Sequence, residues 1–186
     1  TAAIIFQLIE EGKTSLATPL ENYLPGYPHA AGITIGHLLN HRSGIRNITS
    51  IASKETPRTQ EEMLTIIAER TPKYKPGKKT SYSNSNFLLL GYIIEQICKK
   101  SYAGVLQERI VSKIGLTHTY YGYKAAMEKD ECFPYRFKND WEQQPQTDLS
   151  IPGASGGLIS TPTDMVLFME ALFSKKIVNE SSLNKM

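Results

Sequence analysis

Residues 82–100 read Tyr-Ser-Asn-Ser-Asn-Phe-Leu-Leu-Leu-Gly-Tyr-Ile-Ile-Glu-Gln-Ile-Cys-Lys-Lys, and the longest apolar run of the chain lies within them. The large apolar residues recur three and four positions apart, which is the spacing of one helix face: Leu88, Leu89, Ile93, Ile94 and Ile97. The two lysines that follow suit the negative end of a helix. We therefore predict a helix that begins near Ser85 and ends at Lys99-Lys100, and we expect it to be the central core helix.

Further helices are indicated by their capping residues. Thr59-Gln-Glu-Glu62 is a capping box, because the Thr hydroxyl and the Glu carboxylate can each accept from a free backbone amide. Thr161-Pro-Thr-Asp164 places a cap, a first-turn proline and an acid ahead of a long apolar segment. Thr34 can cap a shorter helix. We predict a helix after each of these sites.

The remaining segments complete a mainly α chain with short strands and long loops. A first helix is predicted over Ile5, Leu8 and Ile9 and stops before Gly12. Residues 102–114 are amphipathic, whereas residues 120–155 lose the helical period and suggest a long loop with short strands. Without a repeat, low-complexity tract or linker, residues 1–186 read as a single domain.

The composition is that of a globular chain and excludes several classes of protein. The 186 residues are 40% hydrophobic and 21% charged, enough for one sizeable core without metal or disulfide staples. The net charge is +3 and the basic residues are scattered, which argues against nucleic acid as a partner. The apolar run at 87–94 is shorter than the roughly 20 residues of a membrane span. The two cysteines can form one bridge or none, and the helical spacing of Cys98 favours a core position.

Two histidines allow two interpretations. His37 and His41 stand four residues apart, which is the spacing of a metal pair on a helix. No third ligand is signalled nearby, however, and His37 is not followed by a glutamate that could act as a hydrolytic base. The alternative is that both rings bind protein groups at a helix end. We expect no metal and no other cofactor.

Tyr82-Ser-Asn84 stands out because a phenol and an amide lie two residues apart, directly before the predicted core helix. A rigid helix start can hold both groups toward a cleft. A tyrosine acts as a general base when a nearby cation stabilises its phenolate, and an asparagine can orient a substrate amide. The alternative is a core tyrosine beside a helix cap.

The order of several short motifs resembles the serine β-lactamase-related family, which includes class C β-lactamases, D-alanyl-D-alanine carboxypeptidases and related esterases. The resemblance covers nearly the whole chain. It is carried by Gln7-Leu-Ile-Glu-Glu-Gly-Lys13, Ile33-Thr-Ile-Gly-His-Leu-Leu-Asn-His-Arg-Ser-Gly44, Lys75-Pro-Gly77, Tyr82-Ser-Asn84, Leu90-Gly-Tyr92, Ile114-Gly-Leu-Thr-His-Thr119 and Gly156-Gly-Leu-Ile-Ser-Thr-Pro-Thr-Asp164.

The resemblance implies an acyl-transfer enzyme with a sheet lobe, a helical lobe and a cleft between them. In that family a Ser-x-x-Lys tetrad supplies a nucleophile and a lysine, and a Tyr-x-Asn motif supplies a base and a substrate-orienting amide. Tyr82 and Asn84 match the second motif. Backbone amides would stabilise the tetrahedral oxyanion, each worth about 3 kcal/mol.

In that family the tetrad lies just ahead of the segment that matches Thr1-Ala2, and no Lys-Thr-Gly or His-x-Gly strand follows Lys176 in these residues. The chain is therefore expected to be the helical lobe of a longer hydrolase, inactive alone, with the sheet lobe as its partner. On this interpretation we predict exposed apolar surface along Ala2, Ile5 and Phe6.

The same resemblance places a second group of residues at the border of the cleft: Ser43, Arg46, Asn47, Ser155 and Gly156. Their role would be to shape the cleft, and helix-end turns are an equal alternative. Arg46 could attract a substrate carboxylate or be merely solvated.

The leading hypothesis is a bacterial serine hydrolase that acts on β-lactams, peptidoglycan stem peptides or esters through an acyl-enzyme. A periplasmic or cell-envelope location follows from the family resemblance. The alternative function is a noncatalytic helical module that binds a ligand or partner in the old cleft.

Overall fold

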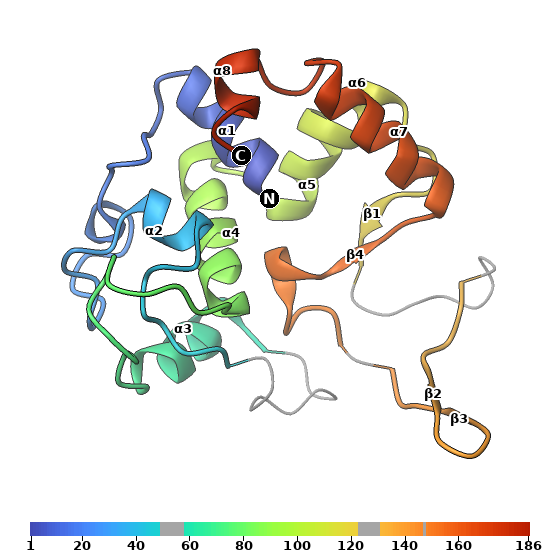
Figure 1. Ribbon diagram of the computed structural model, residues 1–186, viewed down its shortest axis with the longest axis horizontal. Coiled ribbons are helices and arrows are strands. Elements are labelled where there is room, and N and C mark those ends of the chain that lie inside the picture. Colours follow the sequence, from blue (N-terminus) through green and yellow to red (C-terminus); the bar gives the residue numbers. More distant parts are fainter. Residues whose placement is uncertain (49–57, 123–130, 147) are drawn as a thin grey trace.

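The computed structural model describes residues 1–48, 58–122, 131–146 and 148–186, and these form a largely helical body arranged around one central helix (Figure 1). That central helix is α4 (Asn84–Cys98), as the apolar spacing predicted. The other helices are α1 (Ala2–Glu10), α2 (Ile35–Leu39), α3 (Gln60–Ala68), α5 (Tyr102–Leu106), α6 (Ser112–Ile114), α7 (Pro162–Phe173) and α8 (Glu180–Leu183).

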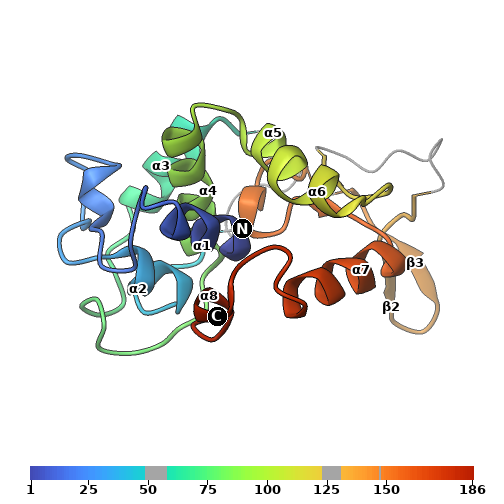
Figure 2. The ribbon, with the colours of Figure 1, turned by 90° about the horizontal axis from the view of Figure 1, so that it is seen from above.

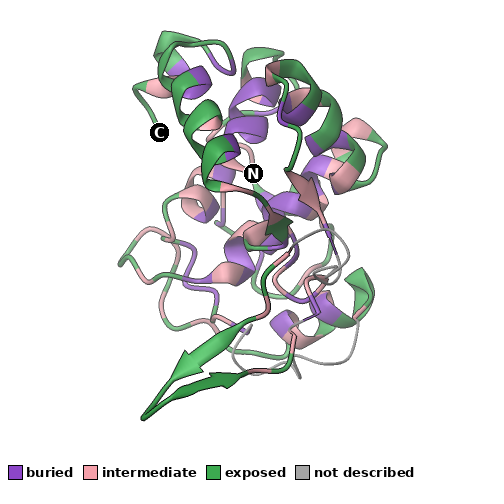
Figure 3. Ribbon diagram, turned by 90° about the vertical axis from the view of Figure 1, so that its right-hand side faces the viewer, coloured by how far each residue is buried: buried purple, intermediate pink, exposed green. Residues whose placement is uncertain are grey.

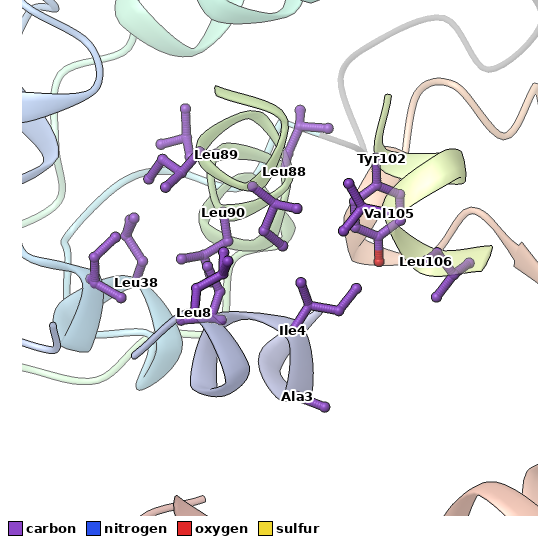
Figure 4. Packing of buried hydrophobic residues seen from close by; sticks show 14 of the residues in the cluster. Ala3, Ile4, Leu8, Leu38, Leu88, Leu89, Leu90, Tyr102, Val105 and Leu106 are labelled. Atoms are coloured by element: carbon purple, nitrogen blue, oxygen red, sulfur yellow. The ribbon is translucent and has the colours of Figure 1, made fainter. Parts of the chain in front are cut away.

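The hydrophobic core surrounds α4. Leu88, Leu89, Leu90 and Ile93 are at most 1% exposed. Figure 4 shows the three leucines among side chains from α1, α2 and α5. Complete burial of a leucine side chain stabilises a fold by about 2 kcal/mol, so this helix supplies a large share of the hydrophobic free energy. Lys99 ends the helix in the left-handed conformation, with φ of 54°.

The expected exposure of the first helix is wrong. Ile5 is fully buried, Phe6 is 3% exposed and Ala2 is half-buried. The physical reason is that α1 is apolar around most of its circumference, so that it lies inside the body against α4 rather than on its surface.

The capping residues act as predicted. Thr59 and Glu62 form both hydrogen bonds of a capping box at the start of α3, and Thr161 accepts from the amide of Asp164 at the start of α7. Thr34 caps α2 in the same way. The amphipathic segment predicted over 102–114 is α5 followed by a π-helical turn, η2 (Gln107–Val111), and α6.

The strands are short and lie in the segment predicted to carry them or just after it. Strand β1 (Tyr120–Tyr121) pairs antiparallel with β4 (Leu158–Ile159). Strands β2 (Tyr135–Phe137) and β3 (Trp141–Gln143) form a hairpin in which Phe137 faces Trp141. The hairpin extends away from the helices, and all of its strand residues are exposed (Figures 1 and 3).

A short 3-10 turn, η4 (Gly153–Ser155), packs directly on α4. A Cβ atom at Gly91 of α4 would lie 2.4 Å from the Cβ of Ala154. The missing side chain at Gly91 is therefore what allows the turn to approach the helix so closely.

Helix α7 has apolar residues on its buried side and also on its exposed side. Ala171 and Leu172 are buried against the body, whereas Met165, Met169 and Phe173, spaced four residues apart, are 46–62% exposed. Successive residues of a helix are 100° apart, so these three form one stripe on the outer side. Figure 2 shows α7 at the edge of the molecule.

No helix of the described residues is both long and apolar enough to cross a membrane. Cys98 and Cys132 are both free, and Cys98 packs partly buried against the core, as its helical spacing indicated.

Candidate active site

The turn at the start of α4 presents Tyr82 and Asn84 together. The phenol of Tyr82 is 64% exposed, and its hydroxyl donates to Oδ1 of Asn84 at 2.6 Å. The alternative of a core tyrosine is therefore wrong. Ser83, between them, is only 1% exposed, and its hydroxyl finds no hydrogen-bond partner among the described residues.

This geometry places two oxygen atoms side by side at the surface. A cation such as a lysine ammonium has three donors, so it can bind a phenol oxygen and an amide oxygen at once. A positive charge in that position would stabilise a phenolate. The pair is therefore suited to holding a cation and exchanging a proton.

The first turn of α4 is fixed by the loop that follows α2. The hydroxyl of Ser85 donates to the carbonyl of Arg46 at 2.7 Å and accepts from the amide of Ile48 at 3.2 Å. One residue further, Oδ1 of Asn86 accepts from the hydroxyl of Ser43 at 2.6 Å. The tertiary structure thus brings residues 43–48 against the Tyr82–Asn84 turn.

The residues predicted from this loop differ in what they offer. Ser43 is buried, and its hydroxyl also accepts from the amide of Ile45, so its side chain is used within the protein. Arg46 is exposed, and its Nε donates to the carbonyl of Thr71 at 2.9 Å. Asn47 lies between the two anchors of Ser85 and is half-buried. Their contact with a ligand stays a prediction.

Ser155 and Gly156 lie at a different level of α4. The turn η4 meets α4 at Leu88 and Gly91, four and seven residues after Asn84, or roughly 6–10 Å along a helix axis. The hydroxyl of Ser155 donates to the carbonyl of Pro152 in its own turn. A hollow of about 230 Å³ lies at this level of α4, and Leu88 and Gly91 are among the residues that line it.

The two histidines bind protein groups. His37 lies at the cap of α2, where its Nδ1 is 3.3 Å from the amide nitrogen of Thr34 and 3.1 Å from the carbonyl oxygen of Gly32. Nδ1 of His41 accepts from the amide of Ser83 and from Nδ2 of Asn86. No cluster of three potential metal ligands occurs within the described ranges. These contacts support the interpretation of both rings as structural groups.

Sequence reasoning missed Asn86, and for His41 it left open a metal pair or a ring that binds protein groups at a helix end. The available signal was the run of polar residues, 83–86, at the start of an otherwise apolar helix. Buried polar groups need hydrogen-bond partners, so these side chains had to meet polar groups from elsewhere in the chain. Only the packing of α2 on α4 identifies those groups.

Fold and turn together define a protein of the serine β-lactamase-related class. The Beta-lactamase family model matches residues 1–186, and the chain belongs to this family. Its order of motifs therefore reflects a true family relationship.

Named relatives are hydrolases and penicillin-binding proteins. The chain is 31% identical to a putative penicillin-binding protein PbpX of Bacillus subtilis over 100% of its own length and 46% of that protein. It is also 30% identical to a teichoic acid D-alanine hydrolase of Staphylococcus aureus, over 96% of this chain and 46% of that protein. The chain thus spans about half the length of these relatives.

The solved structures show the same fold. A D-amino acid amidase from Ochrobactrum anthropi SV3, complexed with L-phenylalanine, superposes with a TM-score of 0.90 at 28% identity. The match covers 98% of this chain and 54% of that one. The β-lactamase and penicillin-binding-protein fold predicted from the motifs is therefore confirmed at this level.

Proposed function

We propose that these residues form the helical lobe of a serine hydrolase that works through an acyl-enzyme, with Tyr82 as its base and Asn84 as its substrate-orienting amide. The observation that carries the proposal is the exposed pair of oxygens at the start of α4, 2.6 Å apart. Membership of a family with hydrolase relatives supports it.

The proposed reaction uses a serine and a lysine from a sheet-bearing part of the family fold that lies outside these 186 residues. The lysine ammonium would lie against the oxygens of Tyr82 and Asn84 and stabilise the phenolate. The phenolate would take the serine proton as the serine oxygen bonds to the substrate carbonyl. The tetrahedral intermediate would then expel the leaving group, which takes that proton from Tyr82, and water would release the acyl group by the same steps. Without the serine the chain alone would be inactive.

For the substrate we propose acyl groups of D-configuration in ester or amide linkage. The names of the two relatives, a teichoic acid D-alanine hydrolase and a D-amino acid amidase, share this chemistry. Peptidoglycan stem peptides end in such residues, and β-lactams present a reactive amide to the same nucleophile. Such substrates, together with the penicillin-binding name of a relative, support a periplasmic or cell-envelope location.

The other predicted residues take supporting roles in this proposal. Arg46 would attract a substrate carboxylate with the guanidinium nitrogens that Thr71 does not use. Ser43 and Asn47 would shape the cleft by holding the start of α4, and Ser155 and Gly156 would form part of its wall.

The test is covalent labelling of the longer protein with a fluorophosphonate or a labelled β-lactam. Tyr82→Phe should slow labelling about 10²- to 10⁴-fold, the usual contribution of a general base. Tyr135→Phe is the matched control, because this tyrosine is also exposed but lies on the β2–β3 hairpin. Equal labelling of Tyr82→Phe and the unchanged protein would exclude Tyr82 as the base. Failure of the unchanged protein to label would favour the noncatalytic binding module.

A further inference from the structure

His41 contacts the Tyr82–Asn84 turn through its ring and through its backbone. Its ring lies 4.6 Å from the ring of Tyr82, centroid to centroid, at 44°, and stacks on Phe87 at 5.3 Å. Because Phe87 is part of α4, the imidazole fills the space between the helix and the phenol. The aromatic contact restricts the direction in which the phenol points.

His41 also binds both residues that flank Tyr82. Its carbonyl accepts from the amide of Ser81 at 2.9 Å, and its ring Nδ1 accepts from the amide of Ser83 at 3.3 Å. The backbone on each side of Tyr82 is thus fastened to one residue. His41 does this with φ of 54°, in the left-handed region that disfavours residues with a side chain.

A second hydrogen bond fixes the protonation of the ring. Nδ2 of Asn86 lies 3.2 Å from the same Nδ1, and Oδ1 of Asn86 accepts from Ser43, which turns the amide donor toward the histidine. Since Nδ1 faces two donors, the neutral ring carries its proton on Nε2. Ser43, Asn86 and His41 therefore form a line of hydrogen bonds that ends at the turn.

We propose that His41, neutral and protonated on Nε2, is the positioning residue that orients Tyr82 for proton transfer. This inference rests on the proposed function for its kinetic consequence, whereas its structural part concerns the 186-residue chain alone. If Nδ1 were protonated, its N–H would face the two donors of Ser83 and Asn86, both hydrogen bonds would be lost, and the turn would be released.

The surroundings of the ring disfavour the protonated form. Burial lowers the pKa of His41 from its ordinary value of 6.5. The ionisable groups on the segments beside it include the cations Arg42, Lys73, Lys75, Lys78 and Lys79 and the phenols of Tyr74 and Tyr82. No carboxylate forms an ion pair with His41 in the part of the chain that the structure describes. The turn should therefore remain ordered at neutral pH and loosen as the pH falls below 6.5.

Two substitutions separate the functions of the ring. His41→Phe keeps an aromatic ring but removes the Nδ1 acceptor, whereas His41→Asn keeps an acceptor near the position of Nδ1 and tolerates the left-handed backbone. His37→Asn is the matched control, because His37 lies in α2, four residues before His41, and contacts Thr34 instead of the turn.

The structural arm is nuclear magnetic resonance of the ¹⁵N-labelled 186-residue chain. We expect an unprotonated Nδ1 at pH 7, and a Ser83 amide resonance that titrates together with the His41 ring below pH 6.5. His41→Phe should shift the Ser83 and Tyr82 resonances, and His41→Asn should restore the Ser83 amide. A protonated Nδ1 at pH 7, or a Ser83 amide that His41→Phe leaves unchanged, would overturn the proposal.

The kinetic arm uses the longer protein. His41→Phe should lower kcat about 10- to 100-fold with little change in KM, as expected for a small misplacement of a catalytic group. His41→Asn should recover most of that loss and move the acid limb of the pH profile, while His37→Asn should leave kcat unchanged. An unaltered kcat in His41→Phe would refute the positioning role. If the unchanged protein proves inactive, the proposed function fails, and the resonance data still decide whether His41 holds the turn.

Discussion

Any side chain at position 44 should destabilise the fold, because of the backbone conformation of Gly44 and its close contact with Tyr74. Its φ is +83°, and a Cβ added there would lie 2.1 Å from the carbonyl oxygen of Tyr74, a backbone atom that cannot rotate away. The left-handed conformation costs a residue with a side chain about 1–2 kcal/mol. Relief of the overlap costs about 1–3 kcal/mol more, as in overpacked cores. Gly44→Ala should therefore lower the free energy of unfolding by about 2–5 kcal/mol.

The assay is urea unfolding followed by circular dichroism, with Gly12→Ala as the control. Gly12 has a similar φ of +69°, but its added Cβ would meet no atom within 4 Å. Its substitution should cost only the conformational part, about 1–2 kcal/mol. Equal losses in the two variants would show that the contact with Tyr74 contributes nothing, and the reasoning would be refuted.

Two further predictions concern charge and surface. The hydrogen bond from Arg109 lowers the pKa of Glu11 from its ordinary 4.5 to about 2. The ionised Glu11 should therefore stabilise the fold above pH 4.5, and this stabilisation should fade as the pH falls toward 2. The urea midpoint of Glu11→Gln, measured across this pH range, should depend less on pH than that of the unchanged protein. The same pH dependence in both proteins would contradict the stabilising role of Glu11. On α7, Met169→Glu should reduce the binding of a hydrophobic dye and change the free energy of unfolding by under about 0.5 kcal/mol, because Met169 is exposed. Leu172→Glu places a charge on the buried face and should unfold the helix. Equal destabilisation by the two substitutions would show that the stripe is not free surface.

Local sequence signals predicted the helices well because the interactions that start a helix join close neighbours. Thr59 and Glu62 are three residues apart, and both of their capping bonds form. Thr161 and Asp164 before α7 are also three residues apart, and the Thr161 side chain accepts from the amide of Asp164. The spacing of apolar residues in α4 likewise identified the helix that the core surrounds.

The sequence was misleading where the outcome depended on what surrounds an element. The first helix is apolar on nearly every side, and its pattern does not say which sides meet other helices. We expected its residues Ile5 and Phe6 at the surface, but the body encloses them. The exposed apolar stripe lies on α7 instead, where a second apolar face accompanies the buried one.

The sequence by itself determined most of the helices, their caps and the pairing of Tyr82 with Asn84, because each depends on residues a few positions apart. Only the tertiary structure decided that His41 and Ser43 contact the same turn. Both bind Asn86, which lies more than 40 residues further along the chain. Those contacts exist because α2 packs on α4 and leaves buried polar groups that must find partners in each other. Residue spacing contains no record of that packing, so the support of the candidate base became visible only in three dimensions.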